Sequence, residues 1–337
     1  TLGACMQARL TVALFLSVLF YIACPTFAQT PSGMPTATEL PDLQAPGATR
    51  PTLFSSVHEV DLVLSVTDHK GRFVPDLLPS QLTILDNGQE QTAITFFQRQ
   101  TNLPLDVALL IDSSSSVTYK FPDEQKTIKH FIKSVIRPND RVAVFAFNEK
   151  VSLAAEVNNN WKQMAKKIMH LKPGGDTAIY DAVSAAASWL GKDHRPSRQI
   201  MILLTDGEEN SSKTSMADAI TNALKANASI YAVNVSAELE DPEQKQGREV
   251  LVRLTDATGG AYLEDTGDSG SNAFRKIERE LRTQYAIAYK PSNLEEAVFH
   301  RIRVLAPGKL RVRCRSGYYA SENALHKALM NTRPPKS

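Results

Sequence analysis

The sequence predicts an α/β protein in which a doubly wound, mostly parallel sheet is inserted into a small antiparallel β domain. Two observations predict this arrangement. The middle of the chain alternates nearly continuous apolar runs with stretches of helical spacing, whereas both ends show the period-two alternation of half-buried strands. Neither end alone carries enough strands to bury its apolar face, so we expect the two ends to pair.

The composition excludes several classes of protein. The chain has 337 residues, with 38 Lys+Arg against 36 Asp+Glu and a formal net charge of +2. This balance argues against a strongly basic nucleic-acid-binding protein, and we expect no nucleic-acid partner. The three cysteines, Cys5, Cys24 and Cys314, are too few for a disulfide framework. The function therefore has to come from specific sites.

The N-terminus, residues 1–28, is typical of a secretory signal peptide. An uncharged apolar run at 10–23 follows Arg9 and is short for a membrane span. Small residues precede the expected cleavage after Ala28, which we favour over a lipoprotein cleavage at Cys24. We therefore expect a secreted or periplasmic protein, or one held at the cell envelope.

The remaining chain divides by composition into a linker, two domains and a tail. Residues 29–56 are rich in Pro, Thr and Ala and are expected to form an extended linker. Residues 57–100 and 283–320 are expected to form the two parts of a β-sandwich-like domain. We place the inserted domain at 103–282 and a flexible tail at 321–337.

Short alternating runs predict the β domain. In Val60–Thr67 every second residue is apolar, and Tyr285, Ile287 and Tyr289 alternate in the same way. Asn87-Gly88 is a strong signal for a type I′ hairpin turn. We expect 92–97 to be the strand that returns from this turn.

Longer apolar runs predict the inserted sheet. Leu105–Ile111 is nearly continuous, as expected of a strand that is covered on both faces. The other expected strands are 141–147, 199–205 and 229–235. The expected helices are 126–136, 161–171, 178–190, 216–226, 248–258 and 272–281. In such sheets, ligands bind beyond the carboxyl ends of the strands.

Polar clusters occur at three points of this edge. Asp112-Ser113-Ser114-Ser115-Ser116 directly follows the first strand, and Gly174-Gly175-Asp176-Thr177 directly precedes a helix. The run 200–204 ends in Thr205-Asp206-Gly207. Each cluster alone is a weak signal, because serine-rich turns and Asp-Gly turns are common.

Together the three clusters resemble the metal-ion-dependent adhesion site of a von Willebrand factor type A domain. The family pattern is Asp-x-Ser-x-Ser, then Thr, then Asp, and the chain matches it over about residues 103–290. The five matching residues are Asp112, Ser114, Ser116, Thr177 and Asp206. The resemblance implies a Rossmann-like fold and a metal-dependent protein-binding function.

The resemblance also implies a role for each of the five residues. Ser114 and Ser116 would bind the metal directly, and Thr177 directly or through water. Asp112 and Asp206 would hold coordinated waters or orient the hydroxyls. Hydroxyl and carboxylate oxygens suit a hard cation, so we expect Mg²⁺, or else Ca²⁺ or Mn²⁺. The open position of such a cation would capture a carboxylate from a protein ligand.

The flanks resemble a group of secreted bacterial proteins that contain a domain related to this family. The likeness is carried by Gly88 to Phe97 and by the closing motif Gly317-Tyr318-Tyr319. It is less specific than the metal motif, and it supports the architecture and export more than a function.

Two other functions remain open alternatives. A Mg²⁺-dependent phosphatase-like hydrolase could use Asp112 as its nucleophile. The resemblance to such enzymes would require Asp-x-Asp after the first strand, with the second Asp as the acid and base. Position 114 is a serine here, so no proton donor is positioned. No phosphate-binding or hydrolase motif occurs elsewhere in the sequence. The third function is a purely structural cell-envelope module. We predict that the protein is not an enzyme.

Several charged residues receive weaker predictions. Asp176, Glu208 and Glu209 are expected to be solvated loop acids, and 237–249 a surface loop. Five arginines of the C-terminal hairpin are expected on one face, either solvated or contacting an anionic envelope surface: Arg301, Arg303, Arg311, Arg313 and Arg315. The seven histidines show no metal-ligand spacing, and the oligomeric state cannot be deduced from the sequence.

Overall fold

The computed structural model describes eight stretches of the chain. These are residues 59–99, 104–118, 121–157, 161–192, 197–235, 242–264, 271–292 and 299–319. The signal peptide, linker and tail expected at 1–28, 29–56 and 321–337 lie outside them, as do Cys5 and Cys24. Across these eight stretches, no helix has the length and apolar character needed to span a membrane.

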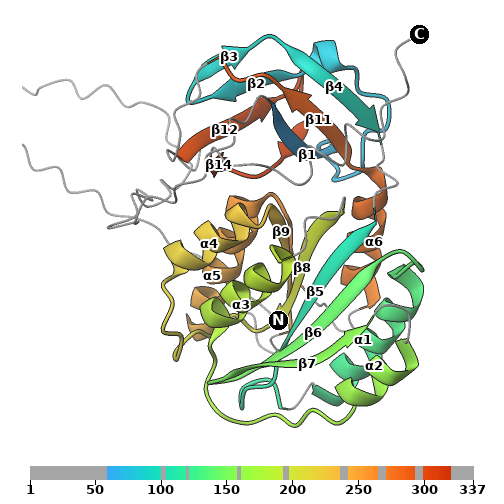
Figure 1. Ribbon diagram of the computed structural model, residues 1–337, viewed down its shortest axis with the longest axis vertical. Coiled ribbons are helices and arrows are strands. Elements are labelled where there is room, and N and C mark those ends of the chain that lie inside the picture. Colours follow the sequence, from blue (N-terminus) through green and yellow to red (C-terminus); the bar gives the residue numbers. More distant parts are fainter. Residues whose placement is uncertain are drawn as a thin grey trace, which may run out of the picture. The chain divides into compact units, whose positions relative to one another are not determined.

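A six-stranded sheet forms the centre of the inserted domain (Figure 1). Its strand order is β10-β9-β8-β5-β6-β7, and only β7 runs antiparallel to its neighbour. The strands are β5 (Leu105–Asp112), β6 (Arg141–Phe147), β7 (Val151–Val157), β8 (Arg198–Thr205), β9 (Ala228–Asn234) and β10 (Tyr262–Glu264).

Helices cover both faces of this sheet, which explains its continuous apolar strands. Helices α1, α2 and α6 pack on one face, and α3, α4 and α5 on the other (Figure 1). Their bounds are α1 (Phe121–Val135), α2 (Trp161–Ile168), α3 (Ile179–Leu190), α4 (Met216–Lys225), α5 (Pro242–Thr258) and α6 (Ser271–Thr283). The predicted doubly wound fold is confirmed.

Two antiparallel sheets form the β domain, with strand orders β13-β1-β11-β4 and β14-β12-β2-β3. The strands are β1 (Val60–Thr67), β2 (Thr83–Asp86), β3 (Gln89–Gln91), β4 (Ile94–Arg99), β11 (Tyr285–Tyr289), β12 (Phe299–Leu305), β13 (Arg311–Arg313) and β14 (Gly317–Tyr319), with a short 3-10 helix at Pro79–Gln81. Leu62 pairs with Ile287, and both belong to the core of this domain. The two ends of the chain therefore pair, as the predicted fold class requires.

Buried polar side chains fasten the two sheets of the β domain together. Asp86 on β2 accepts hydrogen bonds from Tyr289 Oη at 2.8 Å and from Tyr318 Oη at 3.0 Å. Gly317 passes so close to the His300 carbonyl that an added Cβ would lie 2.2 Å from its oxygen. The closing motif Gly317-Tyr318-Tyr319 thus has a packing role in this domain.

The prediction for the returning hairpin strand is wrong. Asn87 and Gly88 have φ values of 49° and 81°, as a type I′ turn requires. Because this turn has only two residues, Asp86 pairs directly with Gln89, and β3 is the returning strand. The expected strand at 92–97 corresponds to β4, which pairs with β11 in the other sheet.

The expected surface loop at 237–249 is partly wrong. Helix α5 begins at Pro242, six residues before the predicted start at Arg248. Proline suits the first turn of a helix because the N–H groups there have no partner within the helix, so the N–H that proline lacks costs no hydrogen bond. Strands β7 and β10 were not predicted, and both lie at edges of the central sheet.

The five C-terminal arginines do not share a solvated face. Strand β12 pairs with β2 and β14, whereas β13 pairs with β1 in the other sheet. Arg313 forms an ion pair with Glu280, and Arg315 donates to the Asp61 carbonyl oxygen at 2.8 Å. Period-two spacing could not predict these contacts. It gives the face of a strand on which a residue lies, but not that one face of the sheet containing β13 and β1 contacts the inserted domain.

A cluster of polar side chains joins the inserted domain to β1. Glu280 on α6 accepts hydrogen bonds from Ser65 Oγ at 2.6 Å and from Tyr231 Oη at 2.9 Å. Gln284 donates to the same two hydroxyl oxygens, each at 2.9 Å. Gln284 is also the only residue between α6 and β11.

Candidate metal centre

The last residue of β5, Asp112, is fully buried at the carboxyl edge of the central sheet. Its Oδ1 accepts a hydrogen bond from the Ser114 backbone N–H at 2.8 Å. Its Oδ2 accepts one from Thr205 Oγ1, at the end of the adjacent strand β8, at 2.5 Å. Asp112 therefore links the ends of the two central strands.

The turn after Asp112 brings two serine hydroxyls together. Ser114 Oγ and Ser116 Oγ lie 3.0 Å apart. Ser114 is buried and Ser116 is exposed, so this hydroxyl pair reaches from the sheet edge to the solvent. The turn is fixed by Ser113, whose backbone N–H and Oγ both donate to the Phe147 carbonyl oxygen, at 2.7 and 2.9 Å.

The loop that carries Thr177 lies against the serine turn. The Ser115 N–H donates to the Gly175 carbonyl oxygen at 3.0 Å, and the Gly174 N–H donates to the Ser113 carbonyl oxygen at 2.8 Å. Gly175 has a φ of 87°, and a Cβ there would lie 2.1 Å from Glu149 Oε2. Only glycine fits this position without a shift of Glu149.

Thr177 is buried and is attached to the loop that follows β8. Its N–H donates to Asn210 Oδ1 at 2.8 Å, and its carbonyl oxygen accepts from the Asn210 N–H at 3.1 Å. In the same loop, Asp206 is buried, and its Oδ1 accepts from the Glu208 N–H at 3.1 Å. The loops that carry Thr177 and Asp206 are thus joined.

The electrostatics of the site favour a cation. Burial raises the pKa of Asp112 to about 7, and the negative charge of Asp206 adds to this effect. Hydrogen bonds from Thr205 and Ser114 oppose it only in part. A positive charge near the carboxylates of Asp112 and Asp206 would offset the cost of burying a negative charge, and would favour the ionised form of Asp112.

The structure brings the five predicted residues together in different ways. Asp112, Ser114 and Ser116 are connected by hydrogen bonds, Asp206 acts on Asp112 through its charge, and Thr177 joins through the hydrogen-bonded loops. Hydroxyl and carboxylate oxygens are suitable donors for a hard divalent cation, so the residues fit such an ion. Among the described residues, this site included, no group of three or more His, Cys, Asp or Glu side chains could hold a metal, so an ion here would depend on the hydroxyl oxygens.

Sequence reasoning missed the supporting residues of this site. Glu209 was expected to be solvated, but its Oε2 accepts from the Ile179 N–H at 2.6 Å, at the start of α3. It thus satisfies a helix N-terminus, where an acidic side chain is favourable. Thr205 was overlooked although it directly precedes Asp206. Asp176 is exposed, as predicted.

A comparison with protein families gives one match. The family model described as von Willebrand factor type A domain matches residues 106–274, about half of the chain. Such a domain is usually a non-enzymatic interaction module, and the match supports a metal-dependent protein-binding module. No curated protein matches the chain.

Several solved structures are similar to the chain. A von Willebrand factor type A protein from Catenulispora acidiphila has 12% identity and a TM-score of 0.45, covering 81% of this chain and 76% of its own. BatB from Bacteroides thetaiotaomicron has 15% identity and a TM-score of 0.43, covering 52% and 97%. The proximal thread matrix protein 1 of the mussel byssus, with a zinc-occupied MIDAS motif, has 16% identity and a TM-score of 0.45, covering 58% and 50%.

Proposed function

Because the chain belongs to the von Willebrand factor type A family, we propose that it is an exported protein-binding module in which a divalent cation captures an acidic side chain of a partner protein. The export rests on the signal peptide expected at 1–28. The domain bounds 57–100 with 283–320 for the β domain, and 103–282 for the insert, belong to the same proposal.

One observation carries this proposal. Three segments far apart in the sequence are linked at one edge of the central sheet through Asp112, the Ser115 N–H and Thr177. Such linkage is what a metal site made of several loops needs, because its ligands must be held in place before the ion arrives.

Ser114, Ser116 and Thr177 are proposed to hold the cation, with Asp112 and Asp206 orienting these hydroxyls and the coordinated waters. When bound, the cation would supply a Lewis-acidic position for a carboxylate oxygen. Because the proposed direct ligands are neutral, little of the ion's charge would be cancelled by them. Ser116 is exposed and marks the side from which a partner approaches.

Mg²⁺ is the proposed ion, with Ca²⁺ and Mn²⁺ as alternatives. Mg²⁺ keeps several waters and is usually bound by only a few protein oxygens, which suits this small set of ligands. A phosphatase-like reaction at Asp112 has no support from the neighbouring position, because Ser114 is not an acid at neutral pH. A purely structural role predicts metal-induced stabilisation without any ligand.

Calorimetric titration of the purified protein with Mg²⁺ tests the metal site. We expect Ser114→Ala to weaken Mg²⁺ binding at least about tenfold, the size of effect seen when supporting or ligating groups are lost. Ser115→Ala is the matched control, because Ser115 lies in the same turn and its side chain is exposed. Equal Mg²⁺ affinities for the Ser114→Ala and Ser115→Ala variants would contradict the proposed set of metal ligands.

Partner capture is tested separately with an immobilised acidic protein ligand. We expect retention in Mg²⁺, loss in EDTA, and loss in Asp112→Ala. Turnover of a phosphate ester by the same preparation would instead favour the enzyme. Thermal stabilisation by Mg²⁺ with no carboxylate-dependent retention would favour the structural role.

A further inference from the structure

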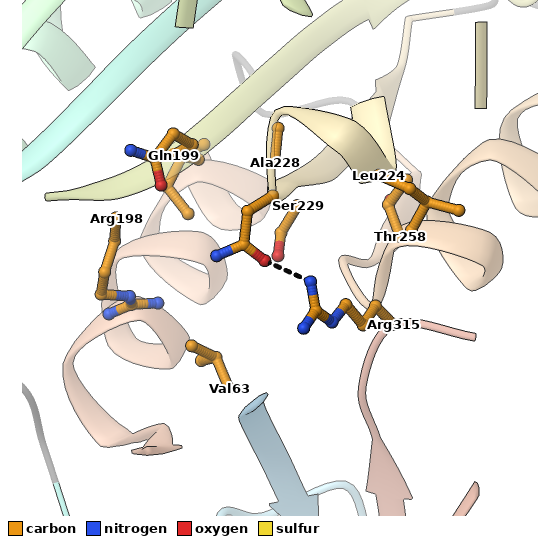
Figure 2. Close-up of a pocket in the computed structure, with 10 residues that line it drawn as sticks. Val63, Arg198, Gln199, Leu224, Ala228, Ser229, Thr258 and Arg315 are labelled. Atoms are coloured by element: carbon orange, nitrogen blue, oxygen red, sulfur yellow. Dashed lines mark hydrogen bonds between the residues drawn. The ribbon is translucent and has the colours of Figure 1, made fainter. Parts of the chain in front are cut away.

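A polar cavity lies at the edge of the central sheet opposite to the candidate metal centre. It is lined by the first residues of β8 and β9, Arg198 and Ala228, and by Val63 and Arg315 of the β domain. Figure 2 shows Arg198 and Arg315 on opposite sides of the cavity. The cavity is partly open to solvent. We call it the arginine cavity.

Arg198 reaches the arginine cavity from a buried position, with 4% of its surface exposed. Its Nη1 donates to the Leu281 carbonyl oxygen at 2.8 Å, and its Nη2 donates to Gln284 Oε1. Both acceptors are neutral and lie at the end of α6. The Nε of Arg198 is buried and has no hydrogen-bond partner among the described residues.

Arg315 faces the cavity from the β domain. Its Nη1 donates to Asn227 Oδ1 at 2.7 Å, and its Nη2 donates to the Asp61 carbonyl oxygen. Its Nε is also buried, and it too lacks a hydrogen-bond partner in the part of the chain that the structure describes. Both guanidinium groups thus use neutral acceptors and retain N–H groups for a further ligand.

The carboxylates of this region act on its three arginines through their charge, whereas the hydrogen-bond acceptors of Arg198 and Arg315 are neutral oxygens. Glu280, the carboxylate that acts on Arg198, already forms an ion pair with Arg313. Asp61 acts on Arg315, and the exposed Asp256 acts on Arg313 from the solvent side. Burial lowers the pKa of both Arg198 and Arg315, because a buried charge is costly. A small anion between the two guanidinium groups would offset this cost.

We propose that the arginine cavity binds a small oxyanion, such as inorganic phosphate or sulfate, between Arg198 and Arg315. Guanidinium groups match the geometry of such anions and form charge-assisted hydrogen bonds with them. Ser229 of β9 also lines the cavity. The ligand joins a strand of the inserted domain to the β domain, so its binding stabilises their contact.

The test is calorimetry of the purified protein with sodium phosphate as the probe. EDTA is present throughout so that no metal contributes, and NaCl keeps the ionic strength constant. We expect saturable binding of about one phosphate per chain and a rise in Tm of about 2 to 5 °C. Sulfate should compete with phosphate. If NaCl alone raises the Tm as much, the effect is general screening and the proposal is overturned.

A pair of variants at Ser229 locates the binding. Ser229→Leu fills the cavity without removing an arginine, and we expect it to lower phosphate affinity at least tenfold. Ser229→Ala leaves the space open and should keep most of the affinity. Arg198 is a poorer choice for the test, because its loss would also free the end of α6. Phosphate binding unchanged in Ser229→Leu would place the anion elsewhere and overturn the proposal, whereas loss of binding in Ser229→Leu alone supports it.

Discussion

Asp112 should make the metal-free protein less stable as the pH rises. Its pKa is about 7 in the folded chain, against 3.8 for an ordinary aspartate. The difference of about three units corresponds to about 4 kcal/mol, at about 1.4 kcal/mol per unit. Because Asp112 is fully buried, solvent does not reduce this figure much.

The sign follows from proton binding. Between about pH 4 and pH 7 the folded state keeps the proton of Asp112 and the unfolded state loses it, so the free energy of unfolding falls as the pH rises. The full contribution is present below the unfolded pKa and is lost by about pH 7. A bound divalent cation favours the ionised carboxylate and should abolish this loss.

Urea unfolding in EDTA at several pH values between 4 and 8 measures the effect. Asp112→Asn is the matched variant, because it has nearly the same shape and does not titrate. It should cost some stability at every pH through altered hydrogen bonds to Thr205, but it should remove the pH-dependent component. Identical pH slopes for the two proteins would refute the reasoning.

Substitutions at four further positions should affect stability, each read out by urea unfolding. Glu280→Ala should cost about 3 kcal/mol, because it leaves a partly buried arginine without its carboxylate, and Glu280→Gln should cost less. Tyr318→Phe should cost about 1 kcal/mol by removing a donor to buried Asp86, and no loss would show that this bond adds nothing. Gly260→Ala should cost about 3 kcal/mol or more, because its Cβ would lie 1.8 Å from a carbonyl oxygen of β9. Gly71→Ala, with φ at +74° and open space around it, should cost only about 1 kcal/mol, and equal losses would contradict the steric argument.

The fold could be predicted because its strands carry strong periodicity. The apolar run at Leu105–Ile111 reads as a strand covered on both faces, and helices cover both faces of β5. The candidate site was predicted because a motif follows or precedes these elements directly. That the five side chains hold an ion, which ion it is, and whether all five contact it stay predictions.

What could not be predicted depends on contacts between distant parts of the chain. In the sequence Glu209 cannot be distinguished from other acidic loop residues, because its partner, the Ile179 N–H at the start of α3, lies far away in the chain. Arg313 and Arg315 look like residues of a solvated strand until α6 and β1 supply their partners. Local spacing gives the face of a strand, but not whether that face meets water or another domain.

Because Gln284 is the only residue between α6 and β11, α6 cannot move far along its axis without moving the β domain. One residue of chain extends by at most about 3.6 Å, whereas a slide by one helical turn moves a helix by about 5.4 Å. Such a slide of α6 would pull on β11, which is held between β1 and β4. Tension along α6 would therefore act on many hydrogen bonds of β11 at once. The connection at Gln284 should resist such a force better than a long flexible linker would.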